Sequence, residues 1–322
     1  MPVHLFDDAF RTAVVVLSAL LLFLYGLEHF SRELQIVGRD RLPRWLGLAT
    51  RDRFRGFLLG ASVTAVVQSS SAVSALVVAL VNAGTLSFAA SLAVLLGAKV
   101  GTTSTAWLVS YELTLIGPYL IVIGGLITLL PFAIRVLGRA IFYFGFIFFA
   151  LDLVSDSLEP LRQSAWVLDW LARAQEPWLG VLMGVVVTVV LQSSSVVSGL
   201  AIVLVQQGVL DPLGAVAIVV GATLGTTATG LIASIPMGAF ARRAAQMNLL
   251  FNAVGVVAML PFISAFAHWA VRTGDTPAQA VALANLAFNA GVALAFLPWT
   301  AWMGRRFAPP GTPPASPANL AV

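Results

Sequence analysis

The segment VVQSSSAVSAL at residues 66–76 decides the fold, because VLQSSSVVSGL at residues 190–200 repeats it. Each Gln-Ser-Ser-Ser is followed 29 residues later by a Gly-Ala-x-x-Gly-Thr-Thr segment, LGAKVGTTST at 96–105 and VGATLGTTAT at 220–229. The two copies align without a gap at a constant offset of 124 residues, a period far longer than that of a solenoid repeat. Two halves that are polar at the centre and apolar at their ends are typical of a membrane transporter with one shared central site.

The composition places the chain in a lipid bilayer. Hydrophobic residues make up 59% of the 322 residues and charged residues only 10%, so one water-soluble core could not bury the apolar surface. The formal charge of +4 comes mainly from arginines in short loops between apolar segments, where they orient helices, and this argues against a nucleic-acid partner. The absence of cysteine excludes disulfides and thiol catalysis. We therefore expect an all-α, multi-pass protein of the cell (inner or plasma) membrane.

Seven apolar segments are long enough to cross the bilayer as helices. They are expected at about 12–34, 86–110, 114–137, 138–159, 211–235, 242–268 and 277–303. Two further apolar segments, 56–83 and 180–207, are interrupted at their centres by Gln-Ser-Ser-Ser, and each limb is too short to cross a hydrocarbon core of about 30 Å. We expect a re-entrant helical hairpin at each interruption. The alternative is one continuous helix whose serines permit close packing.

The repeat extends beyond its identical centres, since LFLYGLEHFSREL near residue 22 resembles IFYFGFIFFALDL near residue 141. This pattern predicts repeat unit 1 at 1–137, inverted repeat unit 2 at 138–268, an additional C-terminal transmembrane helix at 269–306 and a disordered tail at 307–322. Each unit holds three crossings and one hairpin, so the second unit enters the membrane the opposite way up. The loop before the first hairpin is rich in arginine, whereas the matching loop of the second unit is mostly acidic. The positive-inside rule then places the N-terminus outside and the C-terminus in the cytoplasm.

The serine triplets are the candidate anion site. The second limb of a helical hairpin begins with backbone N–H groups that have no helical partner, and with the serine hydroxyls they form a concave set of donors that suits an oxyanion. The candidate ligands are Ser69, Ser70, Ser71, Ser193, Ser194 and Ser195. Ser74 and Ser198 lie one turn further along and extend the same polar face.

Oxygen atoms next to the triplets form the candidate cation site. The two glutamines end the first limbs, where free carbonyls carry the negative end of the helix dipole, and small hard cations bind such oxygens. The Gly-Thr-Thr segments add hydroxyls at a place where two glycines permit a kink or an unwound turn. The candidate ligands are Gln68, Gln192, Thr102, Thr103, Thr226 and Thr227. The alternative for the glycines is a face of small residues that packs helices closely.

A third pattern, Asn-x-x-Phe-Asn, occurs from Asn248 to Asn252 and from Asn285 to Asn289. Asparagines four residues apart share one face of a helix. We expect their main role to be hydrogen bonding between helices, with Asn248 and Asn252 closer to the site because they follow the second repeat centre directly.

The doubled Gln-Ser-Ser-Ser with its downstream Gly-Thr-Thr, the Phe-Asn helix and the GLEHFSREL opening resemble the type II sodium-phosphate cotransporter family over about residues 12–303. The resemblance implies an inverted-repeat symporter in which both hairpin tips meet at mid-membrane. Inorganic phosphate would contact both serine triplets, and Na⁺ ions would occupy neighbouring oxygen cages. It implies no cofactor besides the coupling Na⁺, and we expect the bacterial form that lacks a PhoU-like cytoplasmic domain.

Electrostatics favours cation coupling independently of the resemblance. Hydrogenphosphate carries nearly two negative charges, and dehydrating it in a low-dielectric site requires accompanying cations. The repeat centres contain only Lys99 and Asp211 as ionisable groups, so cations must come from solution. Lys99 stands where the second copy has Thr223. Its ammonium either replaces one sodium ion or pairs with phosphate, or it reaches a carbonyl or the interface and has no role in transport.

Three rival classes use parts of the same pattern. An exporter, or a proton-coupled or sodium-independent phosphate carrier, would use the same site and is the alternative to a sodium-coupled symporter. A channel would need a continuous water-lined path, whereas both polar clusters lie between apolar limbs. An intramembrane serine hydrolase would need a base beside a serine, and only Lys99 is available. We therefore expect a transporter that works by alternating access and not an enzyme.

Overall fold

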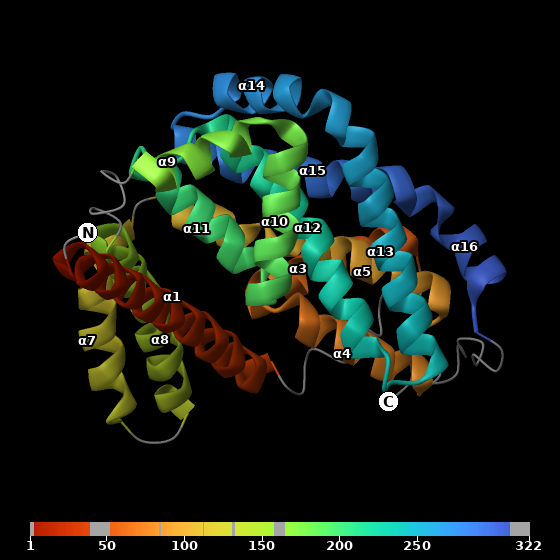
Figure 1. The fold of residues 1–322 in the computed structure, drawn as a ribbon. Helices are drawn as coiled ribbons and strands as arrows, with labels where there is room; N and C mark the ends of the chain where they lie inside the picture. Colours follow the sequence, from red (N-terminus) through yellow and green to blue (C-terminus); the bar gives the residue numbers. More distant parts are fainter. Residues whose placement is uncertain are drawn as a thin grey trace.

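The computed structural model describes residues 3–38, 52–83, 85–111, 113–130, 133–157 and 165–309, and every long element in these ranges is a helix (Figure 1). The helices of the first part of the chain are α1 (Val3–Gly38), α3 (Arg53–Val67), α4 (Ser70–Asn82), α5 (Phe88–Thr102), α6 (Ser104–Ser110), α7 (Gly117–Thr128) and α8 (Ala133–Ser157). Those of the second part are α9 (Ala165–Ala172), α10 (Pro177–Leu191), α11 (Ser194–Gln206), α12 (Pro212–Ser234), α13 (Ala239–Met259), α14 (Ile263–Thr273), α15 (Pro277–Phe296) and α16 (Thr300–Phe307). Most of the predicted arginine-rich loop, at 39–51, and most of the predicted tail, from residue 310, lie outside the described residues.

Within the described ranges, six segments are long and apolar enough to cross a membrane as helices. They are Val14–Val37, Phe88–Ser110, Ile134–Ser157, Pro212–Ile232, Ala239–Thr273 and Pro277–Phe307. The chain is thus an all-α polytopic membrane protein, as the composition predicts. The helix expected at 114–137 ends earlier than predicted: a 3₁₀ turn at Leu113–Ile116 leads directly into α7, which ends at Thr128, and residues 133–137 already belong to α8. α7 is a shorter apolar helix than these six, and that the stretch Leu113–Thr128 crosses the membrane stays a prediction.

Both Gln-Ser-Ser-Ser segments break the helix in the same way. Gln68 and Gln192 adopt the left-handed conformation, each with φ of 56°, and end α3 and α10. Ser69 and Ser193 follow in extended conformation and cap α4 and α11. The alternative of one continuous helix is therefore wrong, because a left-handed residue cannot continue a right-handed helix. That the paired limbs re-enter the same side of the membrane stays a prediction.

Glycines bring the first limb of each break into close contact with the following helix. A Cβ on Gly97 would lie 2.8 Å from the carbonyl carbon of Phe57 and closer still to its oxygen, so α5 packs directly on the backbone of α3. The equivalent Gly221 stands in the same relation to Val181, between α12 and α10. The structure therefore uses these glycines as a small-residue packing face. The predicted unwound turn is absent from α12, which is continuous, and the first copy has only a one-residue interruption at Thr103.

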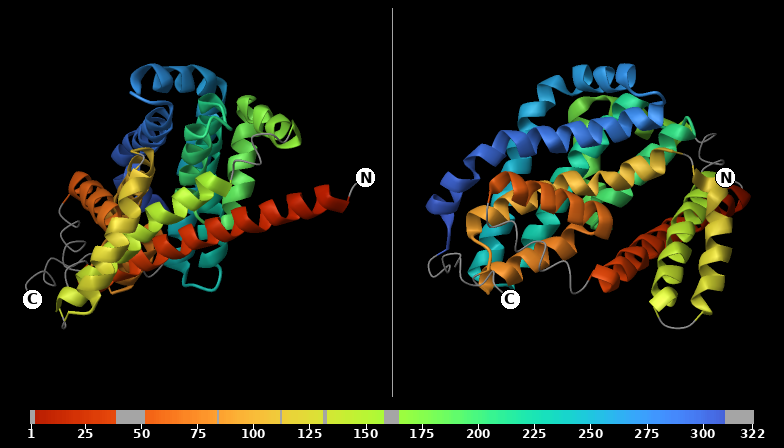
Figure 2. Two further views of the ribbon diagram at one scale, coloured as in Figure 1. Left: turned by 90° about the vertical axis from the view of Figure 1, so that its left-hand side faces the viewer. Right: turned by 180° about the vertical axis from the view of Figure 1, so that it is seen from behind.

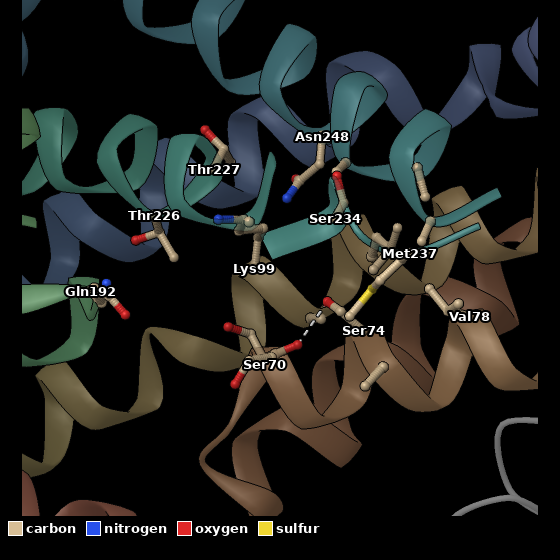
Figure 3. A pocket seen from close by; sticks show the side chains of 18 residues that line it. Ser70, Ser74, Val78, Lys99, Gln192, Thr226, Thr227, Ser234, Met237 and Asn248 are labelled. Atoms are coloured by element: carbon tan, nitrogen blue, oxygen red, sulfur yellow. Dashed lines mark hydrogen bonds between the residues drawn. The ribbon is translucent and has the colours of Figure 1, made fainter. Parts of the chain in front are cut away.

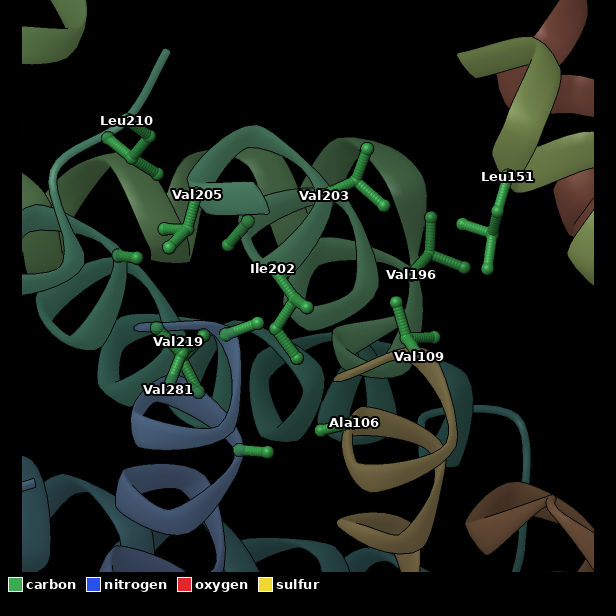
Figure 4. Packing of buried hydrophobic residues seen from close by; sticks show 14 of the residues in the cluster. Ala106, Val109, Leu151, Val196, Ile202, Val203, Val205, Leu210, Val219 and Val281 are labelled. Carbon is green, nitrogen blue, oxygen red and sulfur yellow. The ribbon is translucent and has the colours of Figure 1, made fainter. Parts of the chain in front are cut away.

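The helices form two groups (Figure 2). α7 packs on α8 and α8 packs on α1, and these three helices lie at one side of the molecule. In the larger group, α5 with α6 and α12 are the most enclosed spans, at 67% and 65% buried, and both contact α15. Side chains of α6, α11, α12 and α15 meet in an aliphatic core that includes Val109, Ile202, Val219 and Val281 (Figure 4). α5 and α12 carry the Gly-Thr-Thr segments, so the core holds these segments in fixed positions.

An ion pair joins the two outer helices α1 and α8, between residues of two candidate membrane spans. Nε of Arg139 lies 2.9 Å from Oε1 of Glu33, although the N–H does not point along that line, so the contact is an ion pair and not a hydrogen bond. The Glu33 side chain is only 11% exposed. Because an unpaired charge is costly inside a bilayer, this pair helps to hold α1 against α8.

Candidate functional site

A cavity of about 410 Å³ lies among α4, α5, α12 and α13, beside the loop that joins α10 to α11. Its polar lining residues are Ser70, Ser71, Ser74, Lys99, Gln192, Thr226, Thr227, Ser234 and Asn248 (Figure 3). All of these except Ser234 were singled out from the sequence. Ser234 was missed, although the repeat aligns it with Ser110 at the end of the repeated stretch.

A second hollow of about 10 Å³ lies next to the cavity and shares Ser70 and Lys99 with it. The other residues around this hollow are Thr102, Thr103, Ala106, Ser194, Ser195, Ser198, Thr223, Asn285 and Asn289. Its volume is about the smallest that holds one water molecule. Side chains of both serine triplets therefore lie on one continuous polar wall, although they are 124 residues apart in the sequence.

The first serine of each triplet has a structural task. Oγ of Ser69 accepts a hydrogen bond from the N–H of Ala72 at 3.2 Å, and Oγ of Ser193 accepts one from the N–H of Val196 at 3.4 Å. Neither serine is among the residues that line the two spaces. Of the six predicted anion ligands, the structure thus brings the second and third serines of each triplet together and places the first serines as helix caps.

The two glutamines are not equivalent, although the sequence repeats them. The amide of Gln68 donates to a carbonyl of its own helix and, at 2.8 Å, to Oγ of Ser104, and its oxygen accepts from Thr105 at 2.6 Å. This amide ties the first loop to α6 and is absent from both polar spaces. Gln192 lines the cavity, and within the described part of the chain its side chain has no hydrogen-bond partner. The residue matching Ser104 is Ala228, which has no hydroxyl to bind it.

The hydroxyls of the predicted threonines donate hydrogen bonds to carbonyls of their own helices. Thr102 donates to the carbonyl of Ala98 at 2.8 Å, and Thr227 donates to that of Leu224 at 2.6 Å; Thr103 and Thr226 make similar bonds. A hydroxyl that donates to a helix carbonyl still presents its oxygen lone pairs. On the walls of the cavity and hollow, these oxygens have the chemistry of ligands for a hard cation.

The asparagine patterns contribute more than the sequence suggested. Asn248 lines the cavity, as expected, but Asn252 does not; its amide donates to the carbonyl of Asn248 at 2.8 Å. The buried pair Asn285 and Asn289 of α15, expected to serve mainly as structural glue, lines the hollow. The repeated Asn-x-x-Phe-Asn pattern marks both pairs as alike in the sequence. The packing of α15 against α5 and α12 brings the second pair to the site.

Two further polar groups had no sequence signal. Oγ1 of Thr64 and its repeat counterpart Thr188 are fully buried and have no hydrogen-bond partner among the described residues. They lie one helical turn before the two glutamines and face Gly101 and Gly225 of the neighbouring helices. An unpartnered buried hydroxyl destabilises a protein, and this unfavourable arrangement occurs in both copies of the repeat.

Comparisons with known proteins agree with this architecture. The family model described as Na⁺/Pi-cotransporter matches residues 22–156 and 161–274. YqeW, an uncharacterized protein of Bacillus subtilis (strain 168), is 31% identical over 286 residues, which cover 88% of this chain and 93% of YqeW. YjbB of Escherichia coli (strain K12), which its name describes as a candidate inorganic phosphate export protein, is 29% identical over 297 residues. That alignment covers 91% of this chain but only 55% of YjbB, so the chain spans about half the length of that relative.

A more distant similarity reaches human sodium-dependent phosphate transport protein 2B, with 30% identity over 136 residues. This alignment covers 39% of the present chain and 20% of the human protein. No solved structure matches the chain. The family match covers most of the chain and includes both repeat centres, so the chain belongs to the Na⁺/Pi-cotransporter family, a family of membrane transporters and not of enzymes.

Proposed function

We propose that this protein is a sodium-coupled carrier of inorganic phosphate. The observation that carries the proposal is the convergence of both Gln-Ser-Ser-Ser segments on one polar wall inside an otherwise apolar helical protein. The family and the name of the human relative support phosphate as the substrate and sodium as the coupling ion.

Phosphate would bind between the two serine-capped helix ends. The first turns of α4 and α11 present backbone N–H groups without helical partners, and each of these helices has 13 residues, enough to form a dipole with its positive end at the site. The hydroxyls of Ser70, Ser71, Ser194 and Ser195 lie at those ends and can donate to phosphate oxygens. Hydrogen bonds to a charged group contribute about 1.5–3 kcal/mol each, enough to replace part of the hydration shell of phosphate.

Sodium ions would bind beside phosphate, at oxygens that carry no formal charge. Gln192, Thr226 and Thr227 present such oxygens in the cavity, and Thr102 and Thr103 present them at the hollow. The described residues on the two walls include no carboxylate. A neutral site of this kind binds sodium weakly unless an anion is bound nearby, so each ion favours binding of the other. That mutual dependence would couple the two fluxes.

The transport cycle we propose is alternating access by two inverted repeat units, with the re-entrant hairpins at the centre. The N-terminus would lie outside and the C-terminus in the cytoplasm. Because the chain has no cysteine, single cysteines introduced at the loop residues Glu176 and Gly238 can be labelled from one side of the membrane without background. Inverted topology predicts that an impermeant thiol reagent labels Glu176→Cys in intact cells and Gly238→Cys only after permeabilisation.

The test of transport is uptake of radiolabelled phosphate into proteoliposomes with an inward sodium gradient, compared with potassium and with a pH gradient. Ser194→Ala should lower phosphate affinity by about tenfold to a hundredfold, the equivalent of one lost charge-assisted hydrogen bond. Ser18→Ala is the matched control, because Ser18 is exposed on α1 and bonds to the carbonyl of Val14 in its own helix. Sodium-independent uptake in the wild type would refute the coupling, and equal affinity in Ser194→Ala and Ser18→Ala would refute the site.

Export is the second candidate, favoured by the name of the YjbB relative. The same site would serve it, because coupling thermodynamics and not the binding residues set the direction of net flux. Vesicles loaded with phosphate and sodium, diluted into sodium-free buffer, would measure efflux directly. Comparing its rate with that of uptake at equal and opposite gradients would show whether the carrier favours one direction.

A further inference from the structure

Among the described residues that line the two polar spaces, Lys99 is the one with a charge, and it lies on both walls. It occupies the last turn of α5, two residues after the glycine that packs α5 on α3. Its counterpart in the second repeat, Thr223, is neutral and lines only the hollow. The two repeats therefore present one fixed positive charge to the shared site, and it comes from the first unit alone.

Among the residues that the structure describes, none gives this ammonium a counter-charge. Within the described ranges, the ion pairs join Arg139 to Glu33 and Arg173 to Asp169, and Lys99 takes part in neither. The lining of both spaces includes no aspartate or glutamate. A charge held inside a membrane protein without a partner is strongly unfavourable, so its retention points to a partner that binds transiently.

The side chain also does not behave like a lysine that reaches for the membrane surface. Figure 3 shows it extending from α5 into the cavity, toward Thr226 and Thr227 of α12. No side-chain hydrogen bond holds it as structural glue within the part of the chain that the structure describes. Its direction is therefore that of a ligand-facing group.

We propose that the Lys99 ammonium is the fixed counter-charge of the bound oxyanion and takes the place of one coupling cation at the hollow. The inference rests on the proposed function and deepens it by assigning part of the charge compensation to the protein. The hollow has the size and the oxygen-rich lining of a small-cation site, formed by Thr102, Thr103 and the amides of Asn285 and Asn289. An ammonium at that wall repels a sodium ion in the same space and attracts the anion next to it.

The proposal makes two measurable claims about Lys99→Thr, the substitution that copies the second repeat. First, phosphate affinity at a fixed, low sodium concentration should fall by at least about tenfold, because an opposite charge in a low-dielectric site is lost. Second, the vacated hollow should accept a sodium ion, so the ratio of ²²Na⁺ to ³²P-phosphate taken up should rise by one. Lys99→Arg, which keeps the charge, should retain the wild-type ratio.

The experiment uses the full chain, purified and reconstituted, with ³²P-phosphate binding measured by equilibrium dialysis over a series of sodium concentrations and dual-label uptake measured in the same preparations. Elution of each variant as a single species in gel filtration establishes folding. An unchanged phosphate affinity in Lys99→Thr, or an unchanged ion ratio, would overturn the inference. The binding assay decides even if a variant binds phosphate without transporting it.

Ser194→Ala separates this inference from the proposed function. If Ser194→Ala loses phosphate affinity while Lys99→Thr does not, the phosphate site stands and the counter-charge role is wrong. If the wild-type protein binds no phosphate with or without sodium, both are wrong. If both variants lose affinity and only Lys99→Thr changes the ion ratio, the inference is supported, because a merely structural defect would not add a sodium ion.

Discussion

Replacing Gly97 by alanine tests the close contact between α3 and α5 that positions the site. The added Cβ would lie 2.8 Å from the carbonyl carbon of Phe57 and 2.9 Å from the backbone nitrogen of Ala61, where ordinary contact begins at 3.4 Å. Both neighbours are backbone atoms, so no rotamer change relieves the overlap, and the helices must separate by more than half an ångström. Overpacking of this kind costs about 1–3 kcal/mol or more, and the helix propensity of alanine offsets about 1 kcal/mol. Because the overlap is with backbone atoms on both sides, we expect the upper end of this range, a net destabilisation of about 2 kcal/mol.

Gly291→Ala is the matched control. Gly291 lies in the interior of α15, and apart from its chain neighbours and its own helix backbone no described atom comes within 4 Å of the position that its Cβ would occupy. This substitution should therefore leave stability unchanged or raise it by up to about 1 kcal/mol. Gly221→Ala, the counterpart of Gly97 in the second repeat, should behave like Gly97→Ala because the same backbone contact recurs there.

The assay is reversible unfolding by sodium dodecyl sulfate in mixed micelles, followed by the fluorescence of the eight tryptophans. Free energies extrapolated to zero detergent fraction give the difference between variants. Equal stability of Gly97→Ala and Gly291→Ala would refute the reasoning, because it would mean that α3 and α5 are not in backbone contact. A loss of stability in Gly97→Ala without one in Gly221→Ala would refute the equivalence of the two repeats.

Three further predictions follow from polar groups in the structure. Gln68→Ala should destabilise the protein by about 2 kcal/mol in the same unfolding assay, because it removes the hydrogen bonds between the first loop and α6. Gln192→Ala should change stability by less than about 0.5 kcal/mol. Equal losses in the two variants would contradict the difference between the two glutamines. Arg139→Ala should cost about 2 kcal/mol by leaving the carboxylate of Glu33 unpaired, and adding Glu33→Gln should recover at least half of that loss in a double-mutant cycle. Thr188→Val should raise stability by about 1 kcal/mol, because it replaces an unpartnered buried hydroxyl by a methyl group. Loss of phosphate uptake in this variant would show that the hydroxyl binds an ion during transport.

The sequence by itself determined the membrane setting, the family and the positions of both helix breaks. These properties depend on composition and on local pattern, since apolar length decides whether a helix can span a bilayer and a repeated Gln-Ser-Ser-Ser marks the same local break twice. The serine caps and the left-handed glutamines are equally local, because they involve atoms only a few residues apart. The length of the helix after α6 was missed, since no residue pattern marks the end of α7 as clearly as the serines mark α4.

Only the tertiary structure decided which members of each repeated pair face the site. Gln68 and Gln192 occupy matching positions in the two repeats. Hydrogen bonds to α6 hold the side chain of Gln68, whereas the side chain of Gln192 lines the cavity. Asn285 and Asn289 reach the hollow because α15 packs against α5 and α12, and the direction of Lys99 depends on the same packing. Such contacts join residues far apart in the chain, so their geometry follows from how whole helices pack and not from the local pattern that the two repeats share.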